Sequence, residues 1–263
     1  MIVSEALKAS GIDPREARLL MAEATGFSQA SVLAFQEKEI QQDAQERFRQ
    51  FVEKRKAGEP LAYVVGHKEF YDLDLIVNPA VLIPRPETEL LVEWALQRGF
   101  SKVLDLGTGT GAVALALKKQ EPGSRVFAVE ASAAALVVAK RNATKHALEV
   151  EFRHGRWFEP FAGERFDLIV GNPPYVAEGD PHLADLRFEP PSALVSGRDG
   201  LEAIREIVRD APAYLARGGS LLLEHGMGQD GAVRRLMEQA GLEEVETRPD
   251  LAGIPRVTAG KVK

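Results

Sequence analysis

The four consecutive residues Asn172-Pro173-Pro174-Tyr175 have the types and spacing for a specific piece of chemistry. They follow Phe166–Gly171, an apolar run typical of a buried strand. Proline has no backbone N–H, so the loop presents mainly acceptors, namely the side-chain oxygen of Asn172 and the carbonyl of Pro173. Two such acceptors can hold both hydrogens of a planar NH2 group, and the Tyr175 ring can face the flat group that carries it. The alternative is a proline-rich turn that only caps a strand.

A second candidate site is the glycine loop at 107–111, with the sequence GTGTG, which joins a strand pattern directly to a helix pattern. Glycines let the backbone approach a ligand closely, and a helix N-terminus offers free N–H groups. Glu130 stands 19 positions after Gly111 at the end of the next strand pattern, where an acidic residue can accept from ribose hydroxyls. The loop therefore predicts a nucleotide-like ligand, and by itself it fits both NAD and S-adenosyl-L-methionine (SAM). The alternative is a tight strand–helix turn without a ligand.

Two features favour SAM over NAD. Asp105 lies on the strand just before the first glycine of the loop. A carboxylate there would repel a pyrophosphate, but it suits a cofactor that carries an ammonium and a sulfonium. The second feature is the acceptor-rich loop at Asn172, which suits an amino group as the methyl acceptor. We therefore predict SAM as co-substrate.

The elements that position these loops alternate between strand and helix from Arg85 onward. Such alternation predicts a mostly parallel sheet with helices on both faces. The last two strands are joined by RPDLAGIP, which is too short for a crossover helix, so that pair should be antiparallel. The predicted strands are Lys102–Leu106, Val126–Glu130, Glu149–Arg153, Phe166–Gly171, Ser220–Glu224, Glu243–Thr247 and Arg256–Ala259. The predicted helices are Pro86–Arg98, Ala112–Lys119, Ala133–His146, Leu201–Leu215 and Gly231–Ala240.

The first part of the chain has a different character. Residues 1–68 have helical patterns and no cluster of catalytic side chains, so we expect a helical domain that docks the substrate. Residues 69–84 alternate polar and apolar side chains, and Asn78–Pro79 is a turn signal, which together predict a β-hairpin linker. Residues 85–263 then form the catalytic domain.

Composition restricts the classes of function. The chain of 263 residues has 33 basic and 39 acidic side chains and a net charge of −6, which disfavours general binding of nucleic acid. It has no cysteine, which excludes disulfides, thiolate-bound metals and a cysteine nucleophile. Its five histidines show no metal-ligand spacing, so we expect no metal. We find neither a secretion signal nor an apolar run of about 20 residues, and we expect a cytoplasmic protein without membrane contact.

Taken together, the motifs resemble those of the HemK-type release-factor glutamine methyltransferases. The resemblance runs from about Gly58 to the C-terminus and rests on IPRPETELLVEWAL, DLGTGTGA, NPPYVAEGDPHL, EPPSALVSGRDGL, LLLEHGMGQ and PDLAGIPRVTAG. NPPY alone is shared with adenine and guanine amino methyltransferases. The family methylates the side-chain nitrogen of the glutamine in the Gly-Gly-Gln tripeptide of class I peptide-chain release factors. The resemblance implies an α/β, Rossmann-like SAM-dependent methyltransferase domain that acts, as a monomer, on release factors.

The resemblance also implies roles for individual residues. The catalytic residues would be Asn172, Pro173 and Tyr175, which with Pro174 form the glutamine-binding motif. The residues that would bind SAM are Gly107, Thr108, Gly109, Thr110, Gly111, Glu130, Trp157 and Asn172. One departure is Arg156, which stands where the family commonly has an acidic residue before the tryptophan. The sequence assigns no role to Arg85, Glu87 or His225, and it identifies no proton acceptor.

Other functions remain open at this point. The same chemistry could act on a glutamine of a ribosomal protein or on an exocyclic amine of a nucleic acid. A non-catalytic module that binds SAM or a protein is the third possibility. The intact NPPY sequence argues against that module, because binding SAM does not require it.

Overall fold

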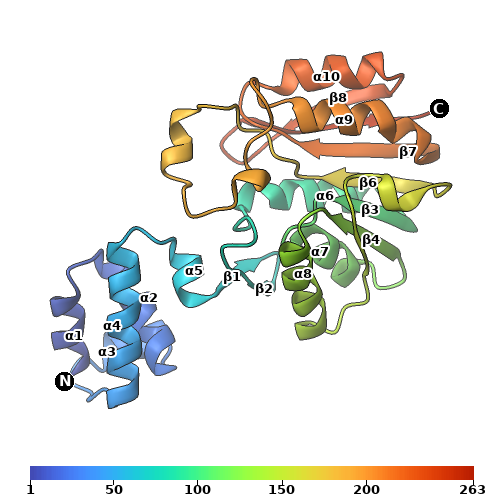
Figure 1. Cartoon of the computed structure of the whole chain (residues 1–263). Coiled ribbons are helices and arrows are strands. Elements are labelled where there is room, and N and C mark those ends of the chain that lie inside the picture. Colours follow the sequence, from blue (N-terminus) through green and yellow to red (C-terminus); the bar gives the residue numbers. More distant parts are fainter. The chain divides into compact units, whose positions relative to one another are not determined.

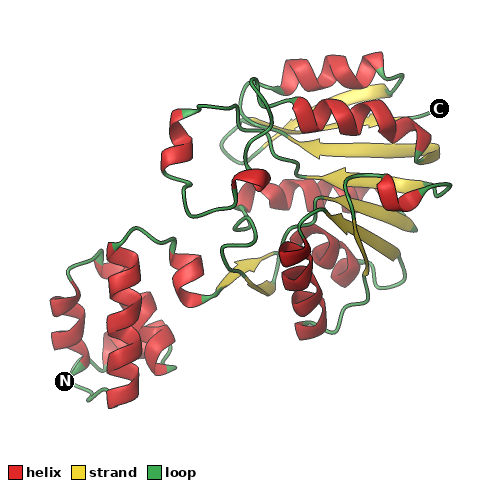
Figure 2. Cartoon of the chain, viewed as in Figure 1, coloured by secondary structure: helices red, strands yellow, loops and turns green.

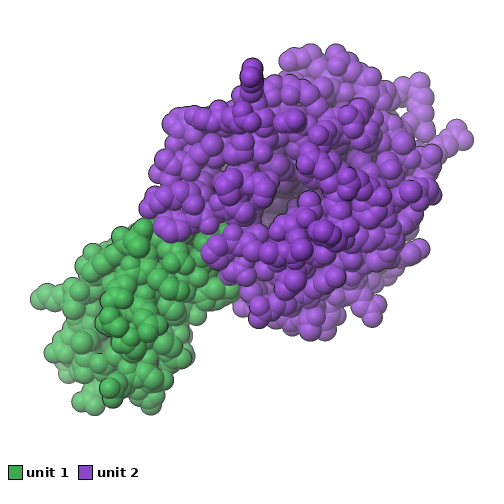
Figure 3. All heavy atoms as spheres, viewed as in Figure 1, with its two compact units in different colours: residues 1–67 green, residues 68–263 purple.

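The computed structural model describes residues 1–263 and divides them into two compact units, Met1–His67 and Lys68–Lys263 (Figure 3). Unit 1 is helical, and its core includes Leu20, Met21 and Phe48. An ion pair of 2.8 Å between the Arg55 Nε and the Glu16 Oε2 joins its two longest helices. The helices of unit 1 are α1 (Val3–Ser10), α2 (Pro14–Thr25), α3 (Gln29–Ala34), α4 (Gln42–Lys56) and α5 (Leu61–Val65).

A two-stranded hairpin follows α5 and consists of β1 (His67–Phe70) and β2 (Leu73–Ile76). Its turn lies at Tyr71 and Asp72, whose φ angles of 47° and 60° are of the kind that a tight hairpin turn requires. The predicted turn signal at Asn78–Pro79 makes a separate turn after β2, in which the Asn78 Oδ1 accepts from the Ala80 N–H at 2.9 Å. The predicted hairpin is therefore present, but it turns earlier than the Asn-Pro signal indicates.

Unit 2 is built on a seven-stranded sheet in the order β5-β4-β3-β6-β7-β9-β8 (Figure 1). Neighbouring strands are parallel from β5 to β7, and β9 is antiparallel to both of its neighbours. This arrangement confirms the predicted mostly parallel sheet with an antiparallel last strand. The strands are β3 (Lys102–Leu106), β4 (Arg125–Glu130), β5 (Glu151–His154), β6 (Phe166–Gly171), β7 (Leu215–Glu224), β8 (Glu243–Pro249) and β9 (Pro255–Lys261).

Helices cover both faces of this sheet (Figure 2). Successive strand residues point to opposite faces, so Leu168 packs in one core and Ile169 in the other. The first core also contains residues of α6 and α7, and the second contains residues of α9 and α10. The helices are α6 (Glu89–Arg98), α7 (Ala112–Gln120), α8 (Ala133–Lys145), α9 (Glu202–Asp210) and α10 (Asp230–Gln239). No helix has both the length and the apolar character needed to span a membrane.

One predicted helix is too long. The expected helix Leu201–Leu215 ends at Asp210 as α9, and Leu215 already belongs to β7. Pro212 has no N–H to continue the helical hydrogen bonds, so the chain makes a short 3₁₀ turn and enters the strand. The 3₁₀ turns of unit 2 are Pro86–Thr88, Glu159–Phe161, Pro181–Ala184, Pro191–Ala193 and Ala211–Ala213.

Asn142 on α8 joins three parts of unit 2. Its side chain is fully buried, and its Oδ1 accepts from the Ile76 N–H of β2 at 2.7 Å. Its Nδ2 donates to the carbonyl oxygens of Ile76, at 3.0 Å, and Thr110, at 2.9 Å. The side chain therefore satisfies backbone groups of both the hairpin and the glycine loop, and it fixes the loop to the helix behind it.

We predict that Asn142→Leu lowers the free energy of unfolding by about 3 kcal/mol, because it leaves three backbone groups buried without partners. Urea unfolding followed by circular dichroism measures this change. Val137→Ala, on an exposed position of the same helix, is the matched control and should change the free energy by less than about 0.5 kcal/mol. An unchanged urea midpoint for Asn142→Leu would contradict the structural role given to this side chain.

Candidate active site

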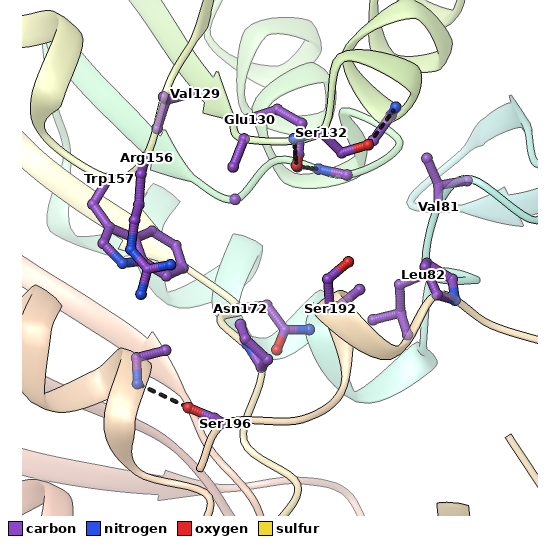
Figure 4. Close-up of a pocket in the computed structure, with 18 of the residues that line it drawn as sticks. Val81, Leu82, Val129, Glu130, Ser132, Arg156, Trp157, Asn172, Ser192 and Ser196 are labelled. Atoms are coloured by element: carbon purple, nitrogen blue, oxygen red, sulfur yellow. Dashed lines mark hydrogen bonds between the residues drawn. The ribbon is translucent and has the colours of Figure 1, made fainter. Parts of the chain in front are cut away.

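A cavity of about 590 Å³ opens at the carboxyl ends of β3, β4 and β6 (Figure 4). The strand order reverses between β3 and β6, and open α/β sheets bind ligands at such a point. The cavity is lined by these predicted site residues: Gly107, Gly109, Glu130, Trp157, Asn172 and Pro174. It is not lined by the others: Thr108, Thr110, Gly111, Pro173 and Tyr175. The structure thus brings together both sequence motifs, although only some residues of each reach the cavity.

The glycine loop is held by backbone hydrogen bonds to the next strand. The N–H groups of Gly107 and Thr108 both donate to the Val129 carbonyl at 3.0 Å. Gly107 has a φ of 70°, and a Cβ at this position would lie 3.3 Å from the Trp157 ring. Glycine is therefore required here both for the backbone conformation and for the close approach of the tryptophan.

Glu130 connects the glycine loop to the segment after β4. Its Oε2 accepts from the Gly109 N–H at 2.9 Å, and its Oε1 accepts from the Ser132 N–H at 2.8 Å. A carboxylate has about four lone-pair positions, so each oxygen keeps a free direction after these bonds. Because Glu130 also lines the cavity, it can still accept hydrogen bonds from the hydroxyls of a bound ribose.

Asp105 lies in the interior, although the sequence-based preference for SAM over NAD places its carboxylate near the cofactor. It is 2% exposed and does not line the cavity. Its Oδ2 accepts from the Thr108 hydroxyl at 2.6 Å and from the Ala114 N–H at 3.2 Å. Burial raises the pKa of this carboxyl to about 7. Asp105 thus fixes the glycine loop to α7.

Arg156 and Trp157 share a carboxylate that the sequence did not reveal. The Trp157 Nε1 and the Arg156 Nε both donate to the Glu206 Oε2, at 2.9 and 3.1 Å. Trp157 has a φ of 46°, an uncommon value for a residue other than glycine, and its bond to Glu206 holds the ring in place. The acidic partner comes from α9, about 50 positions further along the chain, where no local pattern could indicate it.

Asn172 is the polar group of the NPPY loop that reaches the cavity (Figure 4). Its Nδ2 donates to the Thr88 hydroxyl oxygen at 3.1 Å. This bond uses one of the two Nδ2 hydrogens and orients the amide, and the Asn172 Oδ1 is available as an acceptor for a ligand. Pro174 lines the cavity next to it, and Pro173 is buried.

Tyr175 lies behind the cavity wall. Its hydroxyl donates to the Glu224 Oε1 at 3.4 Å, and burial raises the pKa of this phenol. Its backbone carbonyl accepts from the Gln229 Nε2 at 3.0 Å. A Cβ on Gly200 would lie 2.2 Å from that carbonyl oxygen, so only glycine fits there. The DGL segment (Asp199–Leu201) and the HGMGQ segment (His225–Gln229) thus fix the NPPY loop from behind, and Tyr175 is not among the residues that line the cavity.

The residues without an assigned role lie around the site. Arg85 forms an ion pair with Glu189, which is 4% exposed and whose Oε2 also accepts from the Ile83 N–H at 3.0 Å. This contact fastens the segment after the NPPY loop to the segment before α6. His225 is buried, and its Nε2 bonds to the Thr258 hydroxyl at 2.9 Å. Glu87 is exposed and does not line the cavity.

Comparisons with known proteins cover almost the whole chain. The family model described as "Methyltransferase small domain" matches residues 86–187, and the one described as "PrmC N-terminal domain" matches residues 3–66. A release factor glutamine methyltransferase of Xylella fastidiosa is 55% identical over 83% of this chain and 82% of its own length. One of Burkholderia pseudomallei is 46% identical over 98% of this chain and 95% of its own length.

A solved structure shows the same fold at lower sequence identity. It is the 16S rRNA N2 G1207 methyltransferase of T. thermophilus in complex with AdoMet and guanosine, with a TM-score of 0.57 and 23% identity. The match covers 75% of this chain and 50% of that one. Together with the methyltransferase family model, this neighbour supports a Rossmann-like methyltransferase fold.

We predict that Glu130→Ala weakens SAM binding about 10- to 100-fold, because it removes an acceptor for the ribose and the bond that holds the Gly109 N–H. Glu130→Gln, which keeps one acceptor, should lose less. Calorimetric titration measures both changes, and Glu149→Ala, an exposed acid that does not line this cavity, serves as the control. Tight binding of NADH without binding of SAM would overturn this assignment.

Proposed function

The chain belongs to the family of release factor glutamine methyltransferases, and on this premise we propose that it methylates the glutamine of the Gly-Gly-Gln motif in class I peptide-chain release factors. The methyl group comes from SAM, and the acceptor is the side-chain amide nitrogen, N5. The proposed glutamine site is Asn172, Pro173, Pro174 and Tyr175, of which Asn172 and Pro174 line the cavity while Pro173 and Tyr175 support the loop behind it. The proposed SAM site is Gly107, Thr108, Gly109, Thr110, Gly111, Glu130, Trp157 and Asn172, and within it Thr108, Thr110 and Gly111 shape the loop without lining the cavity.

The orientation of Asn172 is the observation that carries this proposal. One N–H of its Nδ2 donates to the hydroxyl oxygen of Thr88, which orients the amide, and its Oδ1 is an acceptor for a ligand in the cavity that Asn172 lines. A free acceptor at this position suits an NH2 group, which can only donate. A substrate carboxylate would instead place an acceptor against an acceptor. Glu130 and Asn172 line the same cavity, so a SAM methyl group and a substrate amide can meet within it.

The reaction balances as a direct transfer. The glutamine nitrogen forms a bond to the methyl carbon as the bond between that carbon and the sulfonium sulfur breaks. The sulfur keeps the electron pair and becomes a neutral thioether, and the nitrogen releases one proton to water. An amide nitrogen is a weak nucleophile because its lone pair is delocalised into the carbonyl. The main contribution of the site is therefore to hold the nitrogen in line with the methyl group.

Two other substrates use the same chemistry, a glutamine of a ribosomal protein and an exocyclic amine of a nucleic acid. The net charge of −6 weighs against a nucleic acid, whose phosphates require basic side chains. Transfer of a labelled methyl group from SAM to a panel of release factors, ribosomal proteins and nucleic acids decides between the three. Preferential labelling of a ribosomal protein or of a nucleic acid would refute the proposed substrate.

We predict that Asn172→Ala lowers the turnover of a Gly-Gly-Gln peptide about 10²-fold or more, because the substrate nitrogen loses the acceptor that orients it. Steady-state kinetics measure turnover, and mass spectrometry of the wild-type product should place one added methyl on the glutamine side chain. Gln120→Ala, which removes an exposed amide that does not line the cavity, is the control. Near-normal turnover of Asn172→Ala, or a methyl on a lysine or a carboxylate, would refute the assignment.

We also propose that the helical N-terminal part, predicted at residues 1–68, docks the protein substrate, with the hairpin linker at 69–84 leading to the catalytic part at 85–263. Residues of unit 1 contribute nothing to the lining of the cavity, and unit 1 has a core of its own. We therefore expect unit 1 to raise the affinity for the whole protein substrate and to leave the rate of methyl transfer unchanged.

We predict that a shortened chain beginning at Lys68 binds SAM with wild-type affinity and methylates a short Gly-Gly-Gln peptide at the wild-type rate. Its KM for an intact release factor should rise at least about 10-fold. Kinetics with the two substrates in parallel separate docking from chemistry. An unchanged KM for the intact protein would show that residues 1–67 do not dock it.

A further inference from the structure

Glu224 is a buried carboxylate that the chemistry described above does not use. It ends β7 and is 1% exposed. Its Oε1 accepts from the Tyr175 hydroxyl at 3.4 Å, whereas its Oε2 is buried without a hydrogen-bond partner. A carboxylate oxygen without a partner in the interior lowers the stability of the fold, so we look for a function of Glu224 or for a further donor close to its Oε2.

Thr88 is the hydroxyl donor that interacts with the Glu224 carboxyl. It is 4% exposed, its oxygen accepts from the Asn172 Nδ2 at 3.1 Å, and its hydroxyl also interacts with the Glu224 carboxyl. A hydroxyl has a single hydrogen, which rotates to the best acceptor. When that hydrogen points at the carboxylate, the Thr88 oxygen can serve Asn172 only as an acceptor.

We propose that Thr88 and Glu224 are positioning residues that fix the orientation of the Asn172 amide. Glu224 attracts the Thr88 hydrogen, Thr88 in turn accepts from the Asn172 Nδ2, and the Asn172 Oδ1 is left facing the substrate. The same carboxylate accepts from Tyr175, so it orients both ends of the NPPY loop. The inference rests on the proposed function only for the identity of the substrate.

The positions of Thr88 and Glu224 show that they act through Asn172 and that neither serves as a base. Neither Thr88 nor Glu224 lines the cavity, so neither can touch the substrate nitrogen. Without them the Asn172 amide could rotate by 180° and present its Nδ2 to the substrate. Two NH2 groups would then face each other, and the site would lose the acceptor that holds the nitrogen in line.

The protonation state of Glu224 should control this arrangement. Burial raises the pKa of this carboxyl to about 7, against the lowering effects of Thr88, Tyr175 and Arg256, and Glu87 adds to the rise. The adjacent His225 is bonded to Thr258 and is kept neutral by burial, which lowers its pKa. Above pH 7 the ionised carboxylate only accepts. Below it, a protonated carboxyl competes as a donor to Thr88 and frees the Asn172 amide to rotate.

The kinetic test compares Thr88→Val, which keeps the shape of the side chain and removes the hydroxyl, with Thr88→Ser, which restores it. We expect Thr88→Val to lower kcat for the Gly-Gly-Gln peptide at least about 10-fold with an unchanged KM for SAM. Thr88→Ser should recover most of the wild-type kcat, and Thr144→Val, an exposed threonine on α8, should have no effect. Wild-type kcat in Thr88→Val would overturn the proposal.

Glu224→Gln provides a second test, which remains informative if Thr88→Val folds poorly. The wild-type kcat should rise as pH increases through about 7, and this step should be absent in Glu224→Gln. A step of the same size in Glu224→Gln would overturn the proposed role of the carboxylate.

A spectroscopic test is independent of the substrate. The Asn172 side-chain NH2 signals of the full chain, identified by their loss in Asn172→Ala, should exchange slowly with solvent and speed up in Thr88→Val. Equal exchange rates would refute the inference whatever the activity. If the wild-type chain fails to methylate the peptide while slow exchange depends on Thr88, the proposed substrate is wrong and the positioning role is supported.

Discussion

The site depends on one constraint, which is that loops at the carboxyl edge of the sheet carry polar backbone groups that no strand or helix pairs. Side chains from other elements supply the missing partners. The Asn142 Nδ2 donates to the Thr110 carbonyl, the Glu130 Oε2 accepts from the Gly109 N–H, and the Gln229 Nε2 donates to the Tyr175 carbonyl. Each of these bonds fixes a loop that lines or supports the cavity. The cavity therefore has a defined shape because its walls are bonded from behind.

The central part of the fold could be predicted from the sequence because its strands carry strong local signals. Lys102–Leu106 and Phe166–Gly171 were predicted with the bounds that the structure has, since each is a short apolar run next to glycine or proline. The hairpin turn at Tyr71–Asp72 has a weaker sequence signal than Asn78–Pro79, because Tyr71 is a bulky residue that seldom adopts a positive φ and no glycine follows Asp72. The apolar pattern continues past the end of α9, and the helix stops at Asp210 because Pro212 cannot continue its hydrogen bonds.

The candidate site was predictable only in its outline, and the reason is spatial. Two glycines, Glu130, Trp157, Asn172 and Pro174 reach the cavity as motif positions. The sequence does not indicate the roles of Glu206, Glu189 and Thr88, because their hydrogen-bond partners are distant along the chain. Glu206 bonds to Trp157 about 50 positions away, and Glu189 bonds to Ile83 more than 100 positions away. The periodicity of apolar residues shows which face of a helix or strand is buried, but it does not show which side chains of other elements contact that face.

The same geometry bears on how glutamine is distinguished from glutamate. One N–H of the Asn172 Nδ2 is bonded to Thr88 at 3.1 Å, and this bond orients the amide so that its Oδ1 is the acceptor at the cavity. A glutamine NH2 group would gain a hydrogen bond there, whereas a glutamate carboxylate would bring a charged acceptor against it. An unpaired polar group at a desolvated site costs about 1–3 kcal/mol, and more for a charged one, which is a factor of roughly ten to more than a hundred in binding. Selection of an amide over an acid therefore needs no cationic or anionic side chain at the cavity wall. On the proposed role of Asn172, such selection requires only that the orientation of one asparagine is fixed, and the residues behind Asn172 then contribute to specificity together with it.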